Sequence, residues 1–500
     1  MTSRGHLAHI RAVNDRFRYL KSVESLFELD QWSALPAEGG AYRRQAAAYV
    51  AQEKAALFRT EESRAAAEFF RGVSLDELGD PIERALVRTF LFRHRNLTRV
   101  PEALAREYSL ARGETMQKWR EAREKKDYQV FAPYLERAFT LKKKIALAIE
   151  PDAPAFDTLV GLTDEGAVRA EIDDAFETLR AGTQDLLARI RKSAVHPDRA
   201  ILREQDPEKM MAFARRLARE SGFDERRGGF DDRVVHAFTS FLGPRDARVS
   251  TYRSGSVDLI FTCLHEAGHA MYAAGGSEAV NAANLWGGAE GGFHEGMARF
   301  NENMIGRGRS YWSCYYPQLQ AEFPDFRGVA AEDFYLALNA VAPGTRRTTA
   351  DEVSYSLHVI LRYELERAWF SGGLAAKDLA DAWNERSERL LGVRPENDAE
   401  GVLQDMHWAG DYIGYFQSYA LGNLYAGQLW ETLRRAVPAL DDDLARGDFA
   451  ALGAWLDENV RQYGCVYTAG ELAERISGKR LDAAPFLRYL EDKYAAMYRV

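Results

Sequence analysis

Two histidines and a glutamate in the segment LHEAGH have the spacing of a hydrolytic metal site: His265 and His269 are four residues apart, and Glu266 follows the first. On an α-helix, residues four apart lie about 40° apart around the axis, so both imidazoles project from one face. Two neutral imidazoles in that position can occupy two corners of a tetrahedral zinc site. Glu266 leaves the backbone beside these ligands, where a general base for water belongs.

The motif by itself does not decide between a metal site and two ordinary polar histidines. A match to HExxH arises by chance in roughly 1–2% of chains with this composition. A catalytic zinc site also needs a third protein ligand and an open position for water.

Glu295 is the candidate for the third ligand. It follows His269 by 26 residues (295 − 269), which is enough for a loop and a returning helix. The apolar stripe that includes Phe293 and Met297 leaves Glu295 facing away from the core of its own helix. Alone, this residue would be interpreted as a solvated acid, but together with the HExxH helix we favour a ligand. His294 directly precedes it and is expected to line the same cleft.

The helix that carries LHEAGH has start signals in the sequence, and two acids are candidates to orient its histidines. Ser256 is the expected N-cap, and Asp258 lies in the first turn. Asp258, seven residues before His265, is one candidate for holding an imidazole in place. Glu302, seven residues after Glu295, is the alternative.

Composition limits the class of protein that carries these residues. Hydrophobic residues make up 46% and charged residues 28% of 500, the balance of a globular chain with an ample core. A net charge of −9 argues against nucleic-acid binding. The chain has no run of 18 apolar residues for a membrane span and no apolar segment of a secretory signal at its N-terminus. Three widely spaced cysteines suit a reducing cytoplasm.

Helical periodicity dominates the chain. Apolar residues recur at spacings of three and four from Leu7 to Leu20, and only 15 prolines interrupt 500 residues. The segment 246–253, DARVSTYR, is the best strand candidate, whereas 223–232 is expected to be a loop. We therefore predict a mostly α-helical fold with a small β element just before LHEAGH.

Several blocks together resemble the carboxypeptidase Taq family of zinc peptidases. LHEAGHAMY, followed by HEGMARFNENMIGR, resembles the metal-binding part of that family. The other blocks follow in the family's order and extend the resemblance over nearly the whole chain: ELDQWSALPAEGGAYRRQ near the N-terminus, HAF at 236–238, DARVS at 246–250, RRTTAD at 346–351 and GVLQDMHW at 401–408, followed by GYFQSYALGNLYAGQLW. The block at 401–408 matches the family pattern GxxQDxHW in full.

The resemblance implies both a chemistry and an architecture. His265, His269 and Glu295 would be the metal ligands, and Glu266 the general base. One zinc ion per chain is implied, or a substitute such as cobalt or manganese. The implied activity is removal of single amino acids from peptide C-termini with broad side-chain preference.

The implied fold is a large helical zincin-like metallopeptidase with a long substrate groove, working as a homodimer. Residues 1–500 would form a single domain, in which about 1–230 cover the cleft and about 231–500 form the catalytic part. The chain departs from the family patterns at four positions, which concern the walls of the cleft rather than the ligands: Ala237, Ser250, Met297 and Arg346.

Stabilisation of a tetrahedral oxyanion needs donors beyond the metal. The segment that begins with GVLQDMHW offers His407, Tyr415 and Tyr419. Aromatic residues at this density more often belong to the core. We assign His407 and Tyr419 to catalysis, and Tyr415 to substrate binding together with His294.

An enzyme that works from the C-terminus must recognise a free carboxylate, which arginine does with two hydrogen bonds. Arg347 is the first choice because it occupies the arginine position of the RRTTAD block, although Arg346 stands beside it. Thr349 and Glu352 are expected to form a capping box for the helix that follows. Arg248, in the strand candidate, is the alternative.

Two other functions remain compatible with these residues. A related helical oligopeptidase or endopeptidase would share the metal site and lack the carboxylate clamp. A catalytically idle peptide- or metal-binding descendant would keep the ligands, and the four departures favour it.

Overall fold

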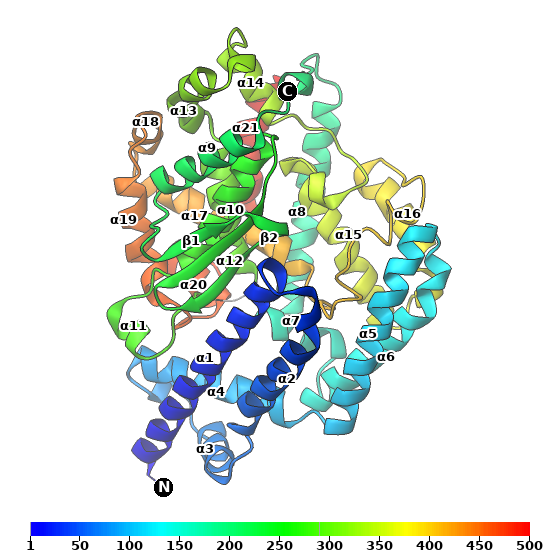
Figure 1. The fold of residues 1–500 in the computed structure, drawn as a ribbon, viewed down its shortest axis with the longest axis vertical. Helices are drawn as coiled ribbons and strands as arrows, with labels where there is room; N and C mark the ends of the chain where they lie inside the picture. The colour runs from blue at the N-terminus through cyan, green and yellow to red at the C-terminus, as the bar shows by residue number, and fades with distance from the viewer. Residues whose placement is uncertain (1, 290) are drawn as a thin grey trace.

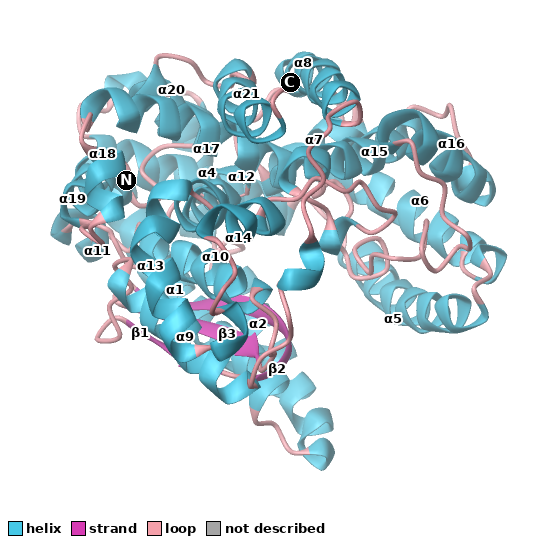
Figure 2. Cartoon of the chain, turned by 90° about the horizontal axis from the view of Figure 1, so that it is seen from above, coloured by secondary structure: helices cyan, strands magenta, loops and turns pink. Residues whose placement is uncertain are grey.

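The computed structural model describes residues 2–289 and 291–500, and it is built mostly from α-helices around a small sheet (Figure 1). Figure 2 shows the three strands together at one side of the helical body. Within those ranges, none of the helices combines the length and apolar character that crossing a membrane requires. The predicted fold class, mostly α with a small β element, is confirmed.

Helices α1 to α9 form the first part of the chain. Helix α1 shows the predicted stripe, since Ile10 and Val13 are buried while the Thr2 hydroxyl caps its first turn by accepting from the Gly5 amide at 3.3 Å. The bounds are α1 (Ser3–Ser33), α2 (Gly40–Ala56), α3 (Glu61–Arg71), α4 (Pro81–Thr98), α5 (Glu102–Lys125), α6 (Ala132–Ile149), α7 (Ala155–Thr163), α8 (Arg169–Ile190) and α9 (Pro207–Glu220).

The sheet has the order β1-β3-β2, with β1 (Gly228–Asp231) parallel and β2 (Arg233–Gly243) antiparallel to the central strand β3 (Asp246–Tyr252). Strand β3 is the predicted strand. The expected loop at 223–232 is wrong in its second half, because β1 pairs there with the free edge of β3. Its two glycines have low β-propensity, so the sequence contains no strand signal here. Gly228 is nevertheless needed, because a Cβ at this position would clash with the Ala247 carbonyl.

Helix α10 lies directly behind the sheet and packs against α9, against α12 and against the π-helix that follows α12. After Arg299 the chain continues as a π-helix, η5 (Phe300–Gly306). The α-helices are α10 (Asp258–Ala273), α11 (Glu278–Ala282), α12 (Gly292–Arg299), α13 (Arg309–Glu322), α14 (Ala331–Leu338), α15 (Glu352–Phe370), α16 (Leu379–Leu391), α17 (Gln417–Ala436), α18 (Leu440–Ala445), α19 (Ala450–Asn459), α20 (Ala469–Ser477) and α21 (Ala484–Tyr498).

A large hydrophobic core runs from α5 to α21, and a smaller core joins the N-terminal helices to two distant loops. In the smaller core, Ile10 and Val13 of α1 belong to one cluster with Val280, Leu285 and Val466. The N-terminal helices are therefore held against the rest of the molecule by apolar burial, the dominant favourable term in folding.

Candidate active site

Helix α10 presents His265 and His269 on the side that the core leaves open. Leu264 and Ala267 are fully buried, whereas both histidines are only partly so. By the bounds of α10 the N-cap position is Val257, one residue later than the expected Ser256. The Ser256 hydroxyl nevertheless accepts from the Asp258 amide in the first turn at 3.2 Å, as expected of a capping serine.

Helix α12 brings Glu295 against the two histidines, and a glycine permits the close approach. A Cβ at Gly268, inside the motif of α10, would lie 2.9 Å from the Ala298 Cα and from the Met297 carbonyl oxygen. Only a glycine therefore lets the two helices come this close.

Ligand atoms of His265, His269 and Glu295 all lie within 4.8 Å of one another. The Glu295 Oε2 atom is 3.9 Å from the Nε2 of His265 and 3.8 Å from the Nε2 of His269. Two imidazole nitrogens and one carboxylate oxygen fit a divalent metal of the zinc type. Sequence reasoning predicted these three residues as ligands, and the structure brings them together.

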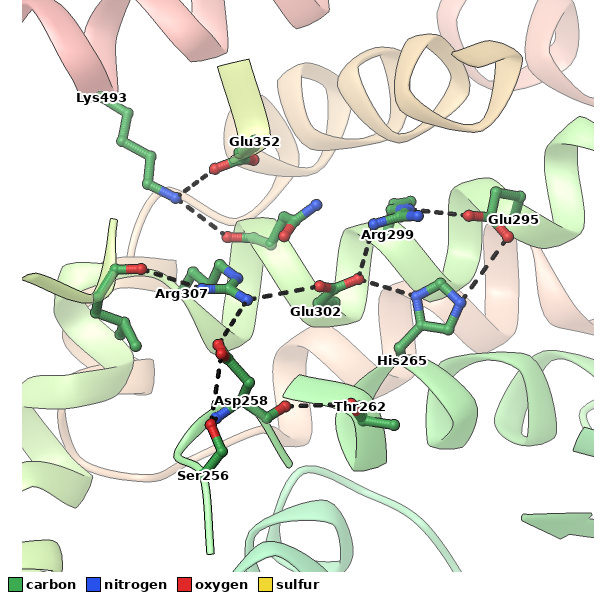
Figure 3. A network of polar contacts seen from close by, with 12 residues as sticks. Ser256, Asp258, Thr262, His265, Glu295, Arg299, Glu302, Arg307, Glu352 and Lys493 are labelled. Atoms are coloured by element: carbon green, nitrogen blue, oxygen red, sulfur yellow. Dashed lines mark hydrogen bonds and ion pairs between the residues drawn. The ribbon is translucent and has the colours of Figure 1, made fainter. Parts of the chain in front are cut away.

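A buried polar network holds this cluster from behind, as Figure 3 shows. The Nδ1 of His265 donates to Glu302 Oε2 at 2.9 Å, which leaves its Nε2 lone pair for the metal. Arg299 joins the two acids, donating to Glu295 Oε1 at 2.9 Å and to Glu302 Oε2 at 3.2 Å. Burial alone would raise the pKa of Glu302, but Arg299 and His265 lower it to about 2. Of the two predicted partners, Glu302 therefore has this place, whereas Asp258 lies near Arg307 at 3.7 Å.

The second histidine has a different partner. The Nδ1 atoms of His269 and His294 are 2.8 Å apart, and the Nε2 of His294 lies 2.9 Å from the Gly287 carbonyl oxygen. The His294 ring also stacks on Phe241 of β2, with ring centroids 4.7 Å apart. His294 thus lies at the expected cleft with both ring nitrogens hydrogen-bonded inside the protein.

Glu266 lies at the cleft beside the ligands and is held by the edge strand. The Thr239 hydroxyl of β2 donates to Glu266 Oε2 at 2.7 Å. Burial raises the pKa of this carboxyl, although His265 and Thr239 oppose the shift.

Tyr415 and Tyr419 line the same cleft, as predicted, and His407 lies just behind them. The Nε2 of His407 is 3.0 Å from the Tyr419 hydroxyl. Burial lowers the pKa of His407 to about 3, so its ring is neutral. Among the described residues, its Nδ1 has no hydrogen-bond partner.

Arg347 is buried in the cleft wall, at the 3₁₀ turn before α15, and shares an acid with a second arginine. Its Nη2 donates to Asp405 Oδ1 at 2.9 Å, and its Nη1 donates to the Tyr355 hydroxyl at 3.1 Å. Arg362 donates through Nε to the other oxygen, Asp405 Oδ2, at 2.6 Å. Two cations face one carboxylate, so the cluster carries a net positive charge.

The structure does not place Arg248 at the cleft, and the capping box expected for α15 does not form. Arg248 lies on β3, half-exposed and paired with Asp246 at 2.8 Å, and it is not among the described residues that line the cleft. The capping box from Thr349 does not form, because Asp351 caps α15 by accepting from the Ser354 amide. Thr349 and Asp351 are both good capping residues, and their spacing in the sequence does not show which of them caps the helix.

Sequence reasoning missed Thr239, Tyr355, Arg362 and Asp405. Asp405 stands two residues before His407 in the block that matches the family in full, so its position offered a signal. Arg362 offered none, since a fully buried arginine on a helix looks like a surface residue in the sequence.

The cleft has a volume of about 980 Å³ and reaches from the metal cluster to the N-terminal helices. Side chains of α1, α2 and α4 line it together with those of β2, α10, α12, α15 and α17. Of the four departures from the family patterns, Ala237 lies in this lining, Ser250 and Met297 are buried behind it, and Arg346 points outward near Glu400 at 3.9 Å.

A helical body whose HExxH helix meets a glutamate from a second helix inside a deep cleft defines a metallopeptidase. The family model of carboxypeptidase Taq (M32) metallopeptidases matches residues 9–494. The chain belongs to this family, and it is accordingly a metallocarboxypeptidase, a peptide hydrolase.

Individual relatives agree with this membership. Thermostable carboxypeptidase 1 of Thermus thermophilus is 36% identical over 505 residues, covering 96% of each chain. The crystal structure of the M32 carboxypeptidase from Deinococcus radiodurans R1 superposes with a TM-score of 0.91 at 34% identity, covering 99% of each chain. A Pyrococcus furiosus carboxypeptidase structure gives a TM-score of 0.92 at 31% identity, covering 98% of this chain and 99% of that one.

Proposed function

We propose that this protein removes single amino acids from the C-termini of peptides, with one zinc ion per chain held by His265, His269 and Glu295. The observation that carries the proposal is the convergence of these ligand atoms within 4.8 Å, inside a cleft that Glu266 also lines. Cobalt or manganese would substitute for zinc at the same donor set. Broad side-chain preference and a homodimer follow from the family resemblance, a cytoplasmic location follows from the three widely spaced cysteines, and all three belong to the same proposal.

Glu266 is the proposed general base. The chemistry supplied by a bound zinc ion is Lewis acidity, which polarises the scissile carbonyl and lowers the pKa of a nearby water molecule. The Thr239 hydroxyl occupies Oε2 of Glu266, so Oε1 is the atom that takes the proton from that water. Glu266 then delivers the proton to the leaving amine.

Tyr419 is the proposed donor to the developing oxyanion. Of the two ring nitrogens of His407, only Nε2 is within hydrogen-bond distance of a partner, the Tyr419 oxygen at 3.0 Å, whereas Nδ1 is 3.8 Å from Asp405 Oδ1. We therefore place the ring proton on Nε2. His407 then donates to the Tyr419 oxygen, which frees the hydroxyl proton of Tyr419 to point into the cleft. Tyr415 beside it contributes to substrate binding.

Arg347 is the proposed clamp for the C-terminal carboxylate. Asp405 is shared with Arg362 and neutralises only one of the two positive charges. The remaining charge lies at the cleft wall, where Nη1 of Arg347 contacts the Tyr355 hydroxyl. A substrate carboxylate accepts charge-assisted hydrogen bonds from this pair.

The test is mass spectrometry of a mixed peptide set after incubation with the zinc- or cobalt-loaded protein. We expect ladders that shorten by one residue at a time from the C-terminus. Glu266→Gln should lower the rate by about 10²- to 10⁴-fold while it retains the metal. Internal fragments would show an endopeptidase instead, and no cleavage with any metal would show an idle binding protein.

C-terminally amidated copies of the same peptides test the clamp. They lack the charge that Arg347 binds, so their KM should rise by about 10- to 100-fold, the value of a hydrogen bond to a charged group. Arg347→Met should raise the KM of the free-acid peptides similarly and leave the amidated ones unchanged. Equal losses on both peptide sets would contradict the assignment of Arg347.

A further inference from the structure

His294 lies next to Glu295 on α12, and its hydrogen bonds fix the tautomer of its neighbour. The Gly287 carbonyl oxygen can only accept, so the Nε2 of His294, 2.9 Å away, carries the proton. With the single ring proton on Nε2, the Nδ1 of His294 is a lone pair. His269, whose Nδ1 lies 2.8 Å away, must therefore donate its own Nδ1 proton to it.

This chain of hydrogen bonds leaves the Nε2 of His269 as a lone pair, at 3.8 Å from Glu295 Oε2. We propose that His294 is a positioning residue that holds His269 in the metal-binding tautomer and orientation, rather than a residue that binds substrate. The inference rests on the proposed metal site formed by His265, His269 and Glu295.

The two imidazole ligands are thus supported differently. His265 donates to the Glu302 carboxylate, whereas His269 donates to the His294 imidazole, which in turn reaches the Gly287 carbonyl. A hydrogen bond to the second ring nitrogen of a ligand fixes its tautomer and ring orientation.

The support continues into the N-terminal helix. Gly287 adopts a φ of +102°, which turns its carbonyl toward His294 and requires glycine. Arg18 of α1 holds the same loop, donating through Nε to the Asn284 carbonyl at 3.1 Å and through Nη2 to the Trp286 carbonyl. The orientation of His269 is thereby tied to a loop that α1 braces.

The test compares His294→Phe with the control Phe241→Leu. The first variant keeps an aromatic ring against Phe241 and removes both ring nitrogens, while the second disturbs the same stacking and keeps both hydrogen bonds. Zinc dissociation constants are measured by competition with a chelator, and the absorption of cobalt-loaded protein reports ligand geometry. KM and kcat are measured at saturating zinc.

We expect His294→Phe to bind zinc about 10- to 100-fold more weakly, with a changed cobalt spectrum and an unaltered KM at saturating zinc. Phe241→Leu should keep zinc affinity close to that of the wild type. A raised KM with unchanged zinc affinity would overturn the proposal and make His294 a substrate-binding residue. Equal losses in both variants would also overturn it.

A second variant covers the case in which His294→Phe does not fold. His294→Gln introduces a side-chain amide that can replace only one of the two hydrogen bonds, to His269 or to the Gly287 carbonyl. We expect an intermediate zinc affinity for this variant. Zinc binding by the wild type is measured without any substrate, so a failure of the proposed peptidase activity is seen separately from a failure of this inference.

Discussion

Glu302 and Asp258 are the two acids that the sequence offered as partners of His265, and only Glu302 contacts it, at 2.9 Å. Glu302→Gln keeps an acceptor oxygen but removes the negative charge behind His265, so we expect zinc affinity to fall by about 10- to 100-fold. Chelator competition measures this loss. Asp258→Asn is the matched control and should leave the affinity unchanged; similar losses in both variants would contradict the role of Glu302.

Asp405 is the shared acid of Arg347 and Arg362; both arginines are buried, and the Asp405 side chain is 9% exposed. Asp405→Asn leaves two buried cations without their counter-charge, so we expect the free energy of unfolding to fall by about 3–5 kcal/mol. Urea denaturation measures the change. Asp246→Asn breaks the half-exposed pair with Arg248 and should cost no more than about 1 kcal/mol. A comparably small loss in Asp405→Asn would contradict this account.

At this scale the sequence predicted the residues whose spacing is local. His265, Glu266 and His269 follow from one helical turn, and Glu295 follows from the next apolar stripe. The partners of Arg347 did not follow, because Asp405 is 58 residues away (405 − 347) and reaches it only through the packing of distant loops.

Among the elements, the loop after α7 contacts the starts of α12 and α17, two helices that pack directly against each other. Asp164 is fully surrounded and accepts from the Gly292 amide at the start of α12 at 2.5 Å. It also accepts from the Ser418 hydroxyl at 2.7 Å and the Gln417 amide at 3.0 Å, at the start of α17. Helix α12 carries Glu295, and α17 carries Tyr419, so this one carboxyl group holds the starts of both helices in place.

Asp164→Asn should therefore lower both stability and catalysis. An amide cannot accept all three hydrogen bonds, and leaving buried donors unpaired costs about 1–3 kcal/mol. Thermal unfolding and kcat are the measurements. Asp157→Asn, which breaks the partly exposed pair between the first turn of α7 and Arg169 at the start of α8, is the control and should cost at most about 1 kcal/mol. An unchanged kcat in a destabilised Asp164→Asn would limit the residue to a structural role.

The long helices and strand β3 could be predicted because their apolar periodicity is strong. The short strand β1 could not, because it exists only through pairing with β3. The sequence prediction places the start of α15 two residues too early, because Thr349 and Asp351 are both good capping residues and the sequence does not rank them; Asp351 makes the cap.

For the whole molecule, three buried titratable groups shape the dependence of stability on pH. Burial lowers the pKa of His358 and of His407 to about 3, and burial raises the pKa of Glu366 to about 8. An unfolded histidine titrates near pH ~6.5, so each histidine contributes stability that is lost as pH falls from about 6.5 toward 3. Unfolded glutamate titrates near pH ~4.3, so Glu366 costs stability as pH rises from about 4.3 toward 8.

From these three groups we expect a stability maximum near pH ~6.5, where the histidine slopes end and the glutamate slope continues. Between about pH 6.5 and 8, the free energy of unfolding of Glu366→Gln should rise relative to that of the wild type by up to about 1.4 kcal/mol per pH unit. Unfolding by urea of the metal-free protein at several pH values measures this difference. A constant difference between Glu366→Gln and wild type across that range would contradict the assignment.

Helix α1 packs its apolar side with Val280 and Leu285, and its Arg18 holds the loop whose Gly287 carbonyl reaches His294. Helix α1 is therefore part of the packing that supports the site, although it is distant in sequence from the proposed ligands. Removal of α1 would expose the apolar surface around Val280 and Leu285 and would remove the hydrogen bonds that hold the loop behind His294. The smallest working version of this peptidase has to begin before α1.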